Sequence, residues 1–425
     1  MTPSFNLQPL MRLLYHLGIL IYLAGIRLAA LYSGKARQWR RGRKYLFRRM
    51  SRAAGGNKPL AWFHCASLGE FEQGRPVMEA FRKHFPACNI LLTFFSPSGY
   101  TVRQSYAGAD HVFYMPADTP ANASRFLELW NPAIAVFIKY DYWYNFLHEL
   151  NKRNIPTVMV SAIFRPRQPF FRPYGFWFRQ HLQQIDHFFV QDRVSEDLLR
   201  GIGIQHLTLS GDTRFDRVVA IAAGEQEVAG LAAFCAQHPV LVAGSTWEAD
   251  EKLLADARRL IPHPTKIIIA PHEIKETDIR RVAGMFGGRV LRYSHAAEGI
   301  PPDTEVLVID SIGLLSALYR YGHVAYIGGG FGQGIHNILE AATFGLPVIF
   351  GPRHQTFREA VDLIRLGGAF PVSSAEQTAR AINVLLEDKS LYGRASATCR
   401  QYVAGNAGAT SQVIDGIKRL LRSAD

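Results

Sequence analysis

A glycine-rich stretch in the second half of the chain carries the clearest sign of ligand binding. It reads Ile-Gly-Gly-Gly-Phe-Gly-Gln-Gly-Ile-His-Asn-Ile-Leu-Glu over 327–340, between an apolar run and a helical pattern. Glycines let backbone N–H groups approach a phosphate, and a helix start adds partial positive charge. The spacing fits neither a dinucleotide-binding GxGxxG fingerprint nor a P-loop ending in Gly-Lys-Ser or Gly-Lys-Thr. We predict an anion cradle around Gly334, although a tight turn before a capped helix would look the same.

Polar residues near this stretch could complete a nucleotide site. His336 and Glu340 are four residues apart, so a helix through both would place them on one face. There the imidazole would face a phosphate, and the carboxylate would accept hydrogen bonds from ribose hydroxyls. Ser245 and Thr246 offer two hydroxyls at another predicted helix start, and His272 follows a further apolar run. A simple cap or turn remains the alternative at each of these places.

Glu70 is the best candidate for acid–base chemistry in the first half. It ends the segment Ala-Ser-Leu-Gly-Glu at 66–70, which follows an apolar run and opens a helical pattern. The helix dipole favours an ionised side chain, so we expect a carboxylate at neutral pH that can take a proton from an acceptor hydroxyl. A first-turn glutamate can also be merely stabilising. Acceptor-binding candidates come from the same segment and from the loop after the next apolar run: Ser67, Gly69, Ser96, Ser98 and Gly99.

These residues follow short apolar runs that alternate with longer helical stretches, which predicts an α/β chain with parallel sheets covered by helices. Ligands bind beyond the carboxyl ends of such strands, and two facing sheets would form a cleft suited to joining two substrates. The predicted strands are 60–64, 90–94, 111–114, 133–138, 157–160 and 187–190 in the first half, and 240–244, 266–270, 306–309, 324–327 and 347–350 in the second.

At 425 residues the chain is long enough for two domains, and 48% apolar with 20% charged residues is a globular composition. We expect two Rossmann-like, doubly wound domains and an amino-terminal anchor. The predicted boundaries are 1–52 for the membrane anchor and basic juxtamembrane segment, 53–216 for an acceptor domain, 217–238 for a linker, 239–408 for a donor domain and 409–425 for a closing helix. Four widely spaced cysteines without a CxxC pair favour a reducing compartment.

The amino terminus predicts attachment to a membrane. Residues 13–26 carry no charge, which is short of the roughly 20 apolar residues that cross a bilayer, so the segment either spans by snorkelling or lies at the interface. Nine Lys or Arg residues and no acid follow between Lys35 and Arg52, within a net charge of +13. A basic block beside an apolar segment is more typical of binding to anionic lipids than to nucleic acid. By the positive-inside tendency, it predicts that the chain downstream lies in the cytoplasm. A solvated basic face or a buried amphipathic helix is the alternative.

Six motifs in order resemble the Kdo transferases, which add 3-deoxy-D-manno-oct-2-ulosonate to the lipid A precursor. They are Phe63-His-Cys-Ala-Ser-Leu-Gly-Glu70, the Ser-Pro-Ser-Gly loop, Trp143 with Asn145, Gly211-Asp-Thr-Arg-Phe-Asp216, Gly244-Ser-Thr-Trp-Glu248 and Gly334-Ile-His-Asn-Ile-Leu-Glu340. The resemblance covers nearly the whole chain.

The resemblance implies an inverting glycosyltransferase of the GT-B type at the cytoplasmic face of the bacterial inner membrane. It implies CMP-Kdo as donor and lipid IVA, the tetraacyl lipid A precursor, as acceptor, without a cofactor or bound metal. Glu70 matches the family's general base, and Arg214 a basic position that would pair with a phosphate or the Kdo carboxylate. The family's nucleotide positions are Ser245, Thr246, Glu248, His336, Asn337 and Glu340.

Some residues depart from the family pattern. Lys139 stands where an acidic residue is frequent, and Asp141 replaces a glutamate, so the second acidic site that we assign to Asp141 has a shorter side chain. Arginines that many members carry after the equivalent of Pro271 and at the position of Ile163 are absent. A GT-B transferase that uses a UDP-sugar, and a membrane-associated nucleotide-binding protein without turnover, are the competing hypotheses.

Overall fold

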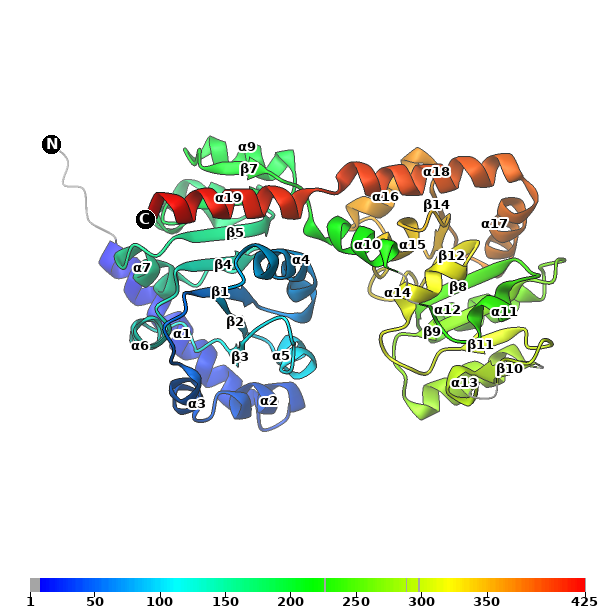
Figure 1. Ribbon diagram of the computed structural model, residues 1–425, viewed down its shortest axis with the longest axis horizontal. Helices are drawn as coiled ribbons and strands as arrows, with labels where there is room; N and C mark the ends of the chain where they lie inside the picture. Colours follow the sequence, from blue (N-terminus) through cyan, green and yellow to red (C-terminus); the bar gives the residue numbers. More distant parts are fainter. Residues whose placement is uncertain (1–7, 225–226, 288, 297–298, 425) are drawn as a thin grey trace. The chain divides into compact units, whose positions relative to one another are not determined.

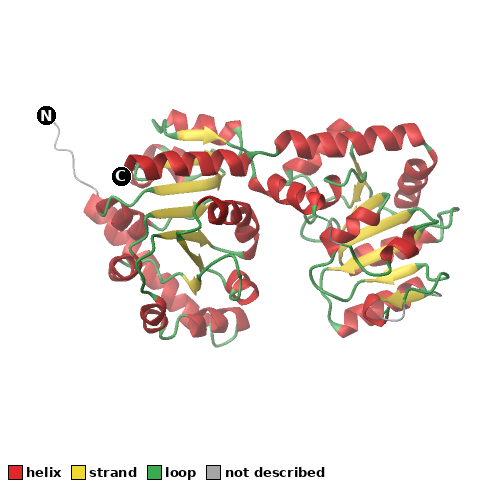
Figure 2. Ribbon diagram, in the orientation of Figure 1, coloured by secondary structure: helices red, strands yellow, loops and turns green. Residues whose placement is uncertain are grey.

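The structure, a computed structural model, describes residues 8–224, 227–287, 289–296 and 299–424 and contains two compact units (Figure 1). The first unit runs to Arg217 and includes the end of the chain from Gly408, and the second comprises Val218–Ala407. Each unit holds one parallel sheet covered by helices (Figure 2). The α/β prediction is therefore confirmed.

The first sheet has seven strands in the order β3-β2-β1-β4-β5-β6-β7. Its strands are buried on both faces, which explains their continuous apolar runs. They are β1 Leu60–Cys65, β2 Asn89–Phe94, β3 His111–Tyr114, β4 Ile134–Ile138, β5 Thr157–Ala162, β6 His187–Val190 and β7 Leu207–Leu209. The helices are α4 Leu68–His84, α5 Pro97–Arg103, α6 Pro120–Trp130, α7 Tyr144–Lys152, α8 Phe176–Leu182 and α9 Arg193–Gly201.

Helix α19, Ala409–Ala424, returns to the first unit (Figure 1). Its residues Val413, Ile414 and Ile417 pack into the apolar core on the sheet face that contains Phe63 and Val136. The carboxylate of Asp216 accepts hydrogen bonds from the backbone N–H groups of Gly408 and Thr410, which fixes the start of the helix. The closing helix thus belongs to the sheet built by the first half of the sequence.

The second sheet also has seven strands, in the order β10-β11-β9-β8-β12-β13-β14. They are β8 Val240–Thr246, β9 Lys266–Pro271, β10 Val290–Arg292, β11 Val306–Val308, β12 Val324–Ile327, β13 Val348–Phe350 and β14 Ala369–Pro371. The helices are α10 Thr213–Ala223, α11 Leu231–Cys235, α12 Glu248–Arg258, α13 Glu276–Phe286, α14 Leu315–Leu318, α15 Leu339–Ala342, α16 Arg358–Leu366, α17 Ala375–Glu387 and α18 Lys389–Asn406. The segment expected as a linker, 217–238, contains the end of α10 and α11.

Three strands escape the sequence pattern: β7, β10 and β14. Each has three residues and stands at an edge of its sheet. An edge strand pairs on one side and is only partly buried, so its apolar run is short and its backbone conformation depends on the neighbouring strand. The predicted strands, by contrast, are nearly all inside the sheets.

The amino-terminal helix α1, Gln8–Ala29, is long and apolar enough to cross a membrane, with a mean hydropathy of 1.5 over its span. It nevertheless lies against the first unit through two polar contacts. The hydroxyl of Tyr15 donates to Asp118, and a ring nitrogen of His16 lies 2.8 Å from Asn145 Oδ1. Much of the rest of its surface is apolar and exposed, with Leu13 63% and Ile21 64% accessible. A docked helix with one exposed apolar face has the form of an interfacial anchor.

Helices α2, Gly34–Gly42, and α3, Leu46–Ala53, carry the basic block that follows. One of its arginines has a structural role. Arg43 donates to the carbonyl oxygens of Met115 at 2.9 Å and Phe95 at 2.8 Å, and its guanidinium lies 3.8 Å from the ring centre of Trp39. Burial lowers the pKa of this guanidinium to about 9. Counting every Lys and Arg of the block therefore overestimates the number of cations that can face a membrane, because Arg43 is engaged within the protein.

We expect Arg43→Met to destabilise the first unit by about 2 to 3 kcal/mol, because two carbonyl oxygens lose a charged donor and a cation–π contact disappears. Urea unfolding in mild detergent, followed by tryptophan fluorescence, measures this, since five of the six tryptophans belong to the first unit. The control is Arg41→Met, two residues earlier in α2, where the side chain is exposed. Equal midpoints for the two variants would show that Arg43 is only another surface cation.

Candidate active site

The predicted catalytic residues follow two neighbouring strands of the first sheet. From β1 the chain proceeds outward to β2 and β3, and from β4 it proceeds to the other edge, so β1 and β4 pair without being consecutive. The loops after such a pair diverge and leave a ligand-sized space at the carboxyl edge of the sheet. Glu70 follows β1 and Asp141 follows β4, and their charges interact. The structure thus brings the two predicted catalytic carboxylates together.

Glu70 occupies the first turn of α4, as predicted, but its ionisation differs from our expectation. The side chain is 5% exposed, and its carboxylate accepts a hydrogen bond from the backbone N–H of Ala66. Burial, followed by the negative charge of Asp141, raises its pKa to about 8, against the lowering effect of the Ala66 N–H and of Lys139. The prediction of a carboxylate at neutral pH is wrong for this state, because desolvation outweighs the helix dipole.

Asp141 lies beside a buried histidine that the sequence analysis did not single out. His64 Nε2 lies 3.0 Å from Asp141 Oδ2, while His64 Nδ1 lies 2.8 Å from the hydroxyl of Thr93. Trp62 also donates to that hydroxyl, at 2.8 Å, and the indole N–H of Trp143 lies 3.2 Å from His64 Nε2. A polar residue inside the apolar run Leu-Ala-Trp-Phe-His-Cys was the available signal, because buried polar groups need partners.

Lys139 stands at the end of β4 with φ +73°, a conformation that non-glycine residues seldom adopt. Its N–H donates to the carbonyl of Val160 at 2.8 Å, which ties the strained residue to the neighbouring strand. The ammonium lies 5.3 Å from the ring centre of Tyr140 and lowers the pKa of Glu70. A cation thus accompanies the two carboxylates where the resemblance suggested a third acid.

The acceptor candidates form two turns that pack on one another. Ser96 caps α5 by accepting from the N–H of Ser98 at 3.3 Å, and the two hydroxyls are 3.0 Å apart. A Cβ on Gly99 would meet the ring of Phe94 at 2.3 Å and the backbone of Ser67 at 3.1 Å, so only glycine permits this approach. Gly69 is exposed in the turn that carries Glu70. The structure therefore places both turns beside the carboxylates' edge of the sheet.

The second unit repeats this arrangement. From β8 the chain proceeds to β9, β10 and β11 on one side, and from β12 to β13 and β14 on the other, so β8 and β12 pair without being consecutive and the loops after them diverge. The glycine-rich stretch follows β12, and Ser245 and Thr246 end β8. Glu248 opens α12, with an exposed side chain. The donor candidates from these two segments are thus neighbours.

The glycine-rich loop has a different internal structure from the one predicted. Backbone N–H groups of six of its residues donate to protein acceptors, among them Gly334 to the carbonyl of Gly329 and His336 to that of Gly328. A Cβ on Gly328 would lie 2.3 Å from the carbonyl oxygen of Ser245, so the glycine serves close packing. The cradle of free amides predicted here is therefore wrong for most of the loop. Helix α15 begins at Leu339, so His336 does not share a helix face with Glu340.

Asp250, which the sequence analysis missed, organises this loop. It is 1% exposed and accepts hydrogen bonds from the N–H groups of Trp247 and Gly329 and the hydroxyl of Tyr326, each at 2.9 Å. Its position three residues after Trp247 is that of a capping box, the signal that could have found it. One carboxylate thus joins the start of α12, strand β12 and the loop.

Three rings stack beside the loop. Trp247 and His272 have ring centres 4.5 Å apart, His272 and His336 lie 4.4 Å apart, and the planes are within 26° of parallel. The indole N–H of Trp247 is 3.0 Å from His336 Nε2. Burial, and then the nearby His272, lowers the pKa of His336 to about 4, so this imidazole is neutral at physiological pH. The stack is a flat surface that can contact a ring or hydrogen-bond a phosphate.

Glu340 is held by two neighbours. Ser316 donates to Oε2 at 2.6 Å and Asn337 donates to Oε1 at 3.0 Å, while Asn337 Oδ1 accepts from the N–H of Leu339 at 3.2 Å. Arg214, the remaining donor candidate, belongs to the first unit, where it forms an ion pair with Asp212 at 2.8 Å. The structure thus groups the donor candidates of the second unit, while Arg214 belongs to the first unit.

Comparisons with known proteins agree with this architecture. A family model described as 3-deoxy-D-manno-octulosonic-acid transferase matches residues 40–217. The chain is 27% identical to the 3-deoxy-D-manno-octulosonic acid transferase of Bordetella pertussis over 411 residues, which cover 89% of this chain and 94% of the relative. The Haemophilus influenzae transferase is 26% identical over 85% of this chain and 87% of its own length.

Solved structures show the same fold. The UDP-GlcNAc 2-epimerase of Neisseria meningitidis superposes with a TM-score of 0.61 at 16% identity, covering 85% of this chain and 100% of the epimerase. MurG of Acinetobacter baumannii superposes with a TM-score of 0.54 at 13% identity, with the same coverage. At these identities the likeness concerns the fold alone. In sequence the chain is thus similar, over most of its length, to 3-deoxy-D-manno-octulosonic acid (Kdo) transferases, and it has a GT-B-like fold.

Proposed function

We propose that this protein transfers Kdo from CMP-Kdo to lipid IVA, with inversion at the anomeric carbon, at the cytoplasmic face of the inner membrane. One observation carries the proposal. In this chain, which matches the Kdo transferase family model, Glu70 is a buried carboxyl beside Asp141. It lies at the edge of a parallel sheet where ligands bind, and its pKa is raised to about 8.

Glu70 acts as the general base in this proposal. Its carboxylate takes the proton of the acceptor's primary hydroxyl as the oxygen attacks the anomeric carbon of Kdo. The bond from that carbon to the CMP phosphate breaks, and CMP leaves with the electron pair. A carboxylate with a pKa near 8 is a stronger base than an exposed one, and it still ionises near physiological pH. Asp141 sustains this basicity by its charge, and His64 lies 3.0 Å from its carboxylate.

The second unit binds the nucleotide in this proposal. Glu340, already oriented by Ser316 and Asn337, accepts hydrogen bonds from the ribose hydroxyls. The stack that contains His272 and His336 contacts the phosphate through its imidazole rings. Around them we assign Ser245, Thr246, Glu248 and Gly334 to the donor, Arg214 to the donor's phosphate or carboxylate, and Ser67, Gly69, Ser96, Ser98 and Gly99 to the acceptor.

Helix α1 attaches the protein to the membrane that holds the lipid acceptor. Its exposed leucines supply apolar area, and the exposed cations of α2 and α3 face anionic lipids. Because this basic block follows the apolar helix, the positive-inside tendency assigns the catalytic body to the cytoplasmic side.

We expect Glu70→Gln to lower kcat by about 10²- to 10⁴-fold, the usual contribution of a general base. The assay combines purified full-length protein, CMP-Kdo generated in place and lipid IVA, and follows the lipid by mass spectrometry. The control is Glu79→Gln, which changes an exposed glutamate of the same helix. Wild-type product heavier by Kdo supports the proposal. Wild-type turnover in Glu70→Gln would show that Glu70 is not the general base. No product from any folded preparation would contradict the proposed transfer itself.

The rate should also depend on pH through Glu70. Since the base acts when deprotonated, kcat/KM should rise with pH and level off above a midpoint near 8. Asp141→Asn removes the charge that helps to raise this pKa, so the midpoint should move to lower pH, while burial keeps it above the ordinary value of 4.5. An active Asp141→Asn enzyme with an unchanged midpoint would assign the titration to another group.

Nucleotide protection tests the donor assignment. We expect CMP to raise the unfolding temperature more than UMP or UDP at equal concentration, because a bound ligand stabilises the folded state according to its affinity. Glu340→Gln should weaken CMP binding about 10- to 100-fold by removing a charged acceptor. The control is Glu376→Gln, on the exposed first turn of α17. Better protection by UDP would favour a UDP-sugar transferase, and no protection by any nucleotide would contradict a donor site in the second unit.

A further inference from the structure

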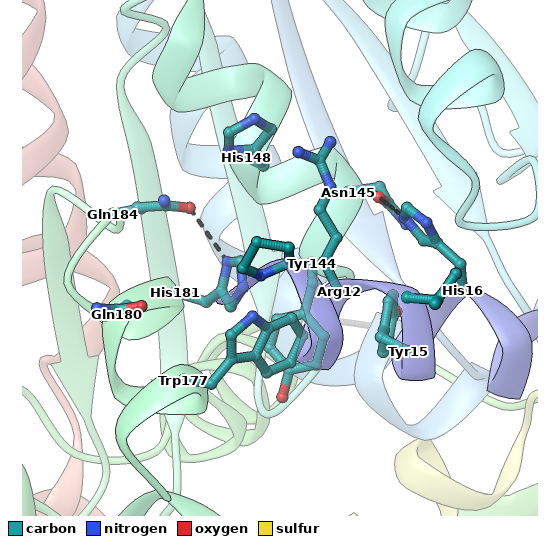
Figure 3. A pocket seen from close by; sticks show the side chains of 12 residues that line it. Arg12, Tyr15, His16, Tyr144, Asn145, His148, Trp177, Gln180, His181 and Gln184 are labelled. Atoms are coloured by element: carbon teal, nitrogen blue, oxygen red, sulfur yellow. Dashed lines mark hydrogen bonds between the residues drawn. The ribbon is translucent and has the colours of Figure 1, made fainter. Parts of the chain in front are cut away.

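A cavity of about 590 Å³ opens between α1, α7 and α8 in the first unit (Figure 3). Helix α1 contributes Arg12 and His16, α7 contributes His148, and α8 contributes His181. No member of the candidate catalytic groups lines it. The cavity is therefore a separate feature of the first unit.

The lining of this cavity is basic. Among the described residues that surround it, none is Asp or Glu. Arg12 and His148 have no hydrogen bond or ion pair within the described part of the chain, and in Figure 3 the guanidinium of Arg12 extends toward His148. His16 is 2.8 Å from Asn145, and His181 is 3.4 Å from Gln184. The cavity thus offers two unpartnered donors to an anion.

Electrostatic repulsion inside the cavity points the same way. Burial first, and then the charge of Arg12, lowers the pKa of His148, while Glu149 raises it and Lys152 lowers it. The pKa of His181 is lowered to about 4, mainly by burial and also by His148 and Arg12, against its bond to Gln184. An anion between these groups would relieve the repulsion and favour protonated His148.

The rest of the wall is aromatic and continues into the exposed face of the anchor. Tyr15 and Tyr144 have ring centres 4.9 Å apart, and Tyr144 and Trp177 are equally close. Leu13 lines the cavity although 63% of it is accessible, and Leu14 and Leu17 are each 51% accessible on the same helix. Aromatic side chains with polar tips are typical of the boundary between headgroups and acyl chains.

We propose that this cavity binds the phosphate headgroup of a membrane phospholipid, with the acyl chains along the exposed leucines of α1. The adjoining apolar helix favours a lipid over a soluble phosphate, because it supplies a surface for the chains. The site is distinct from the basic block. At about 1.5 Å per residue, Arg12 and the carboxyl end of α1 at Ala29 are roughly 25 Å apart along the helix. The proposal does not depend on which sugar the enzyme transfers.

Vesicle binding by the full-length protein tests the site. We compare phosphatidylcholine vesicles with vesicles that also contain one fifth phosphatidic acid, in 0.5 M NaCl, where the Debye length of about 4 Å screens exposed cations. Wild type should prefer the acidic vesicles at least fivefold. Arg12→Gln/His148→Gln should lose this preference, whereas Arg40→Gln/Arg41→Gln, which removes two exposed cations of α2, should keep it. Retained preference in the cavity variant, or equal loss in both, would overturn the proposal.

Two measurements separate a lipid from a free anion and from misfolding. Millimolar inorganic phosphate should leave the preference for phosphatidic acid intact; abolition of the preference would show that the cavity binds a free anion. By NMR, the imidazole pKa of His148 should rise by about one unit on binding acidic vesicles, and no change would contradict contact with phosphate. Urea midpoints of both double variants should match wild type, and CMP protection should be unchanged, which excludes loss of structure as the cause.

Discussion

The interaction on which the candidate catalytic centre depends is the repulsion between two carboxyl groups kept out of water. Glu70 and Asp141 come from loops after neighbouring strands, and the pairing of β1 with β4 forces these loops to meet. Two carboxylates in such a place would separate or take up protons unless something held them. The His64–Thr93–Trp62 network lies against Asp141, and the N–H of Ala66 donates to Glu70. The fold thereby gives Glu70 a pKa that an exposed glutamate would not have.

A buried carboxylate has the opposite task in the second unit. Asp250 is satisfied by three donors and carries no chemistry in our account, yet it joins β12, the glycine-rich loop and α12. Because its hydrogen bonds are complete, it stabilises a loop conformation in which the glycines pack against β8 and β13. The ligand-facing groups, Glu340 and the stacked rings, are consequently presented by side chains rather than by loop amides. In both units the candidate residues follow two paired strands that are not consecutive in the chain. In the first unit this place raises the pKa of a carboxyl group, and in the second unit it fixes the conformation of a loop.

The sequence predicted the strands inside the sheets and the residues at their carboxyl ends, because buried parallel strands are continuous apolar runs and polar residues interrupt them at the edge. It could not predict strand order, on which the meeting of Glu70 and Asp141 depends. The pKa of Glu70 was misjudged for a related reason: the helix start is visible in the sequence, but the burial and the second carboxylate come from tertiary structure. Likewise, glycines at Gly328 and Gly330 indicate close approach in any sequence, and only the structure shows that the approaching groups are the backbone of Ser245 and of Gly351.

The placement of helix α1, the candidate membrane anchor, also depends on a few polar contacts. An apolar helix alone could adopt any tilt in a bilayer, since tilt is set by what the helix packs against. Here Tyr15 bonds to Asp118, which also accepts from the N–H groups of Asn145 and Phe146 at the start of α7. That helix follows directly on the loop that carries Asp141. The start of α7, where α1 docks, is therefore only a few residues along the chain from Asp141. In the first unit, the placement of α1 is consequently coupled to the start of α7, next to one of the two candidate catalytic carboxylates.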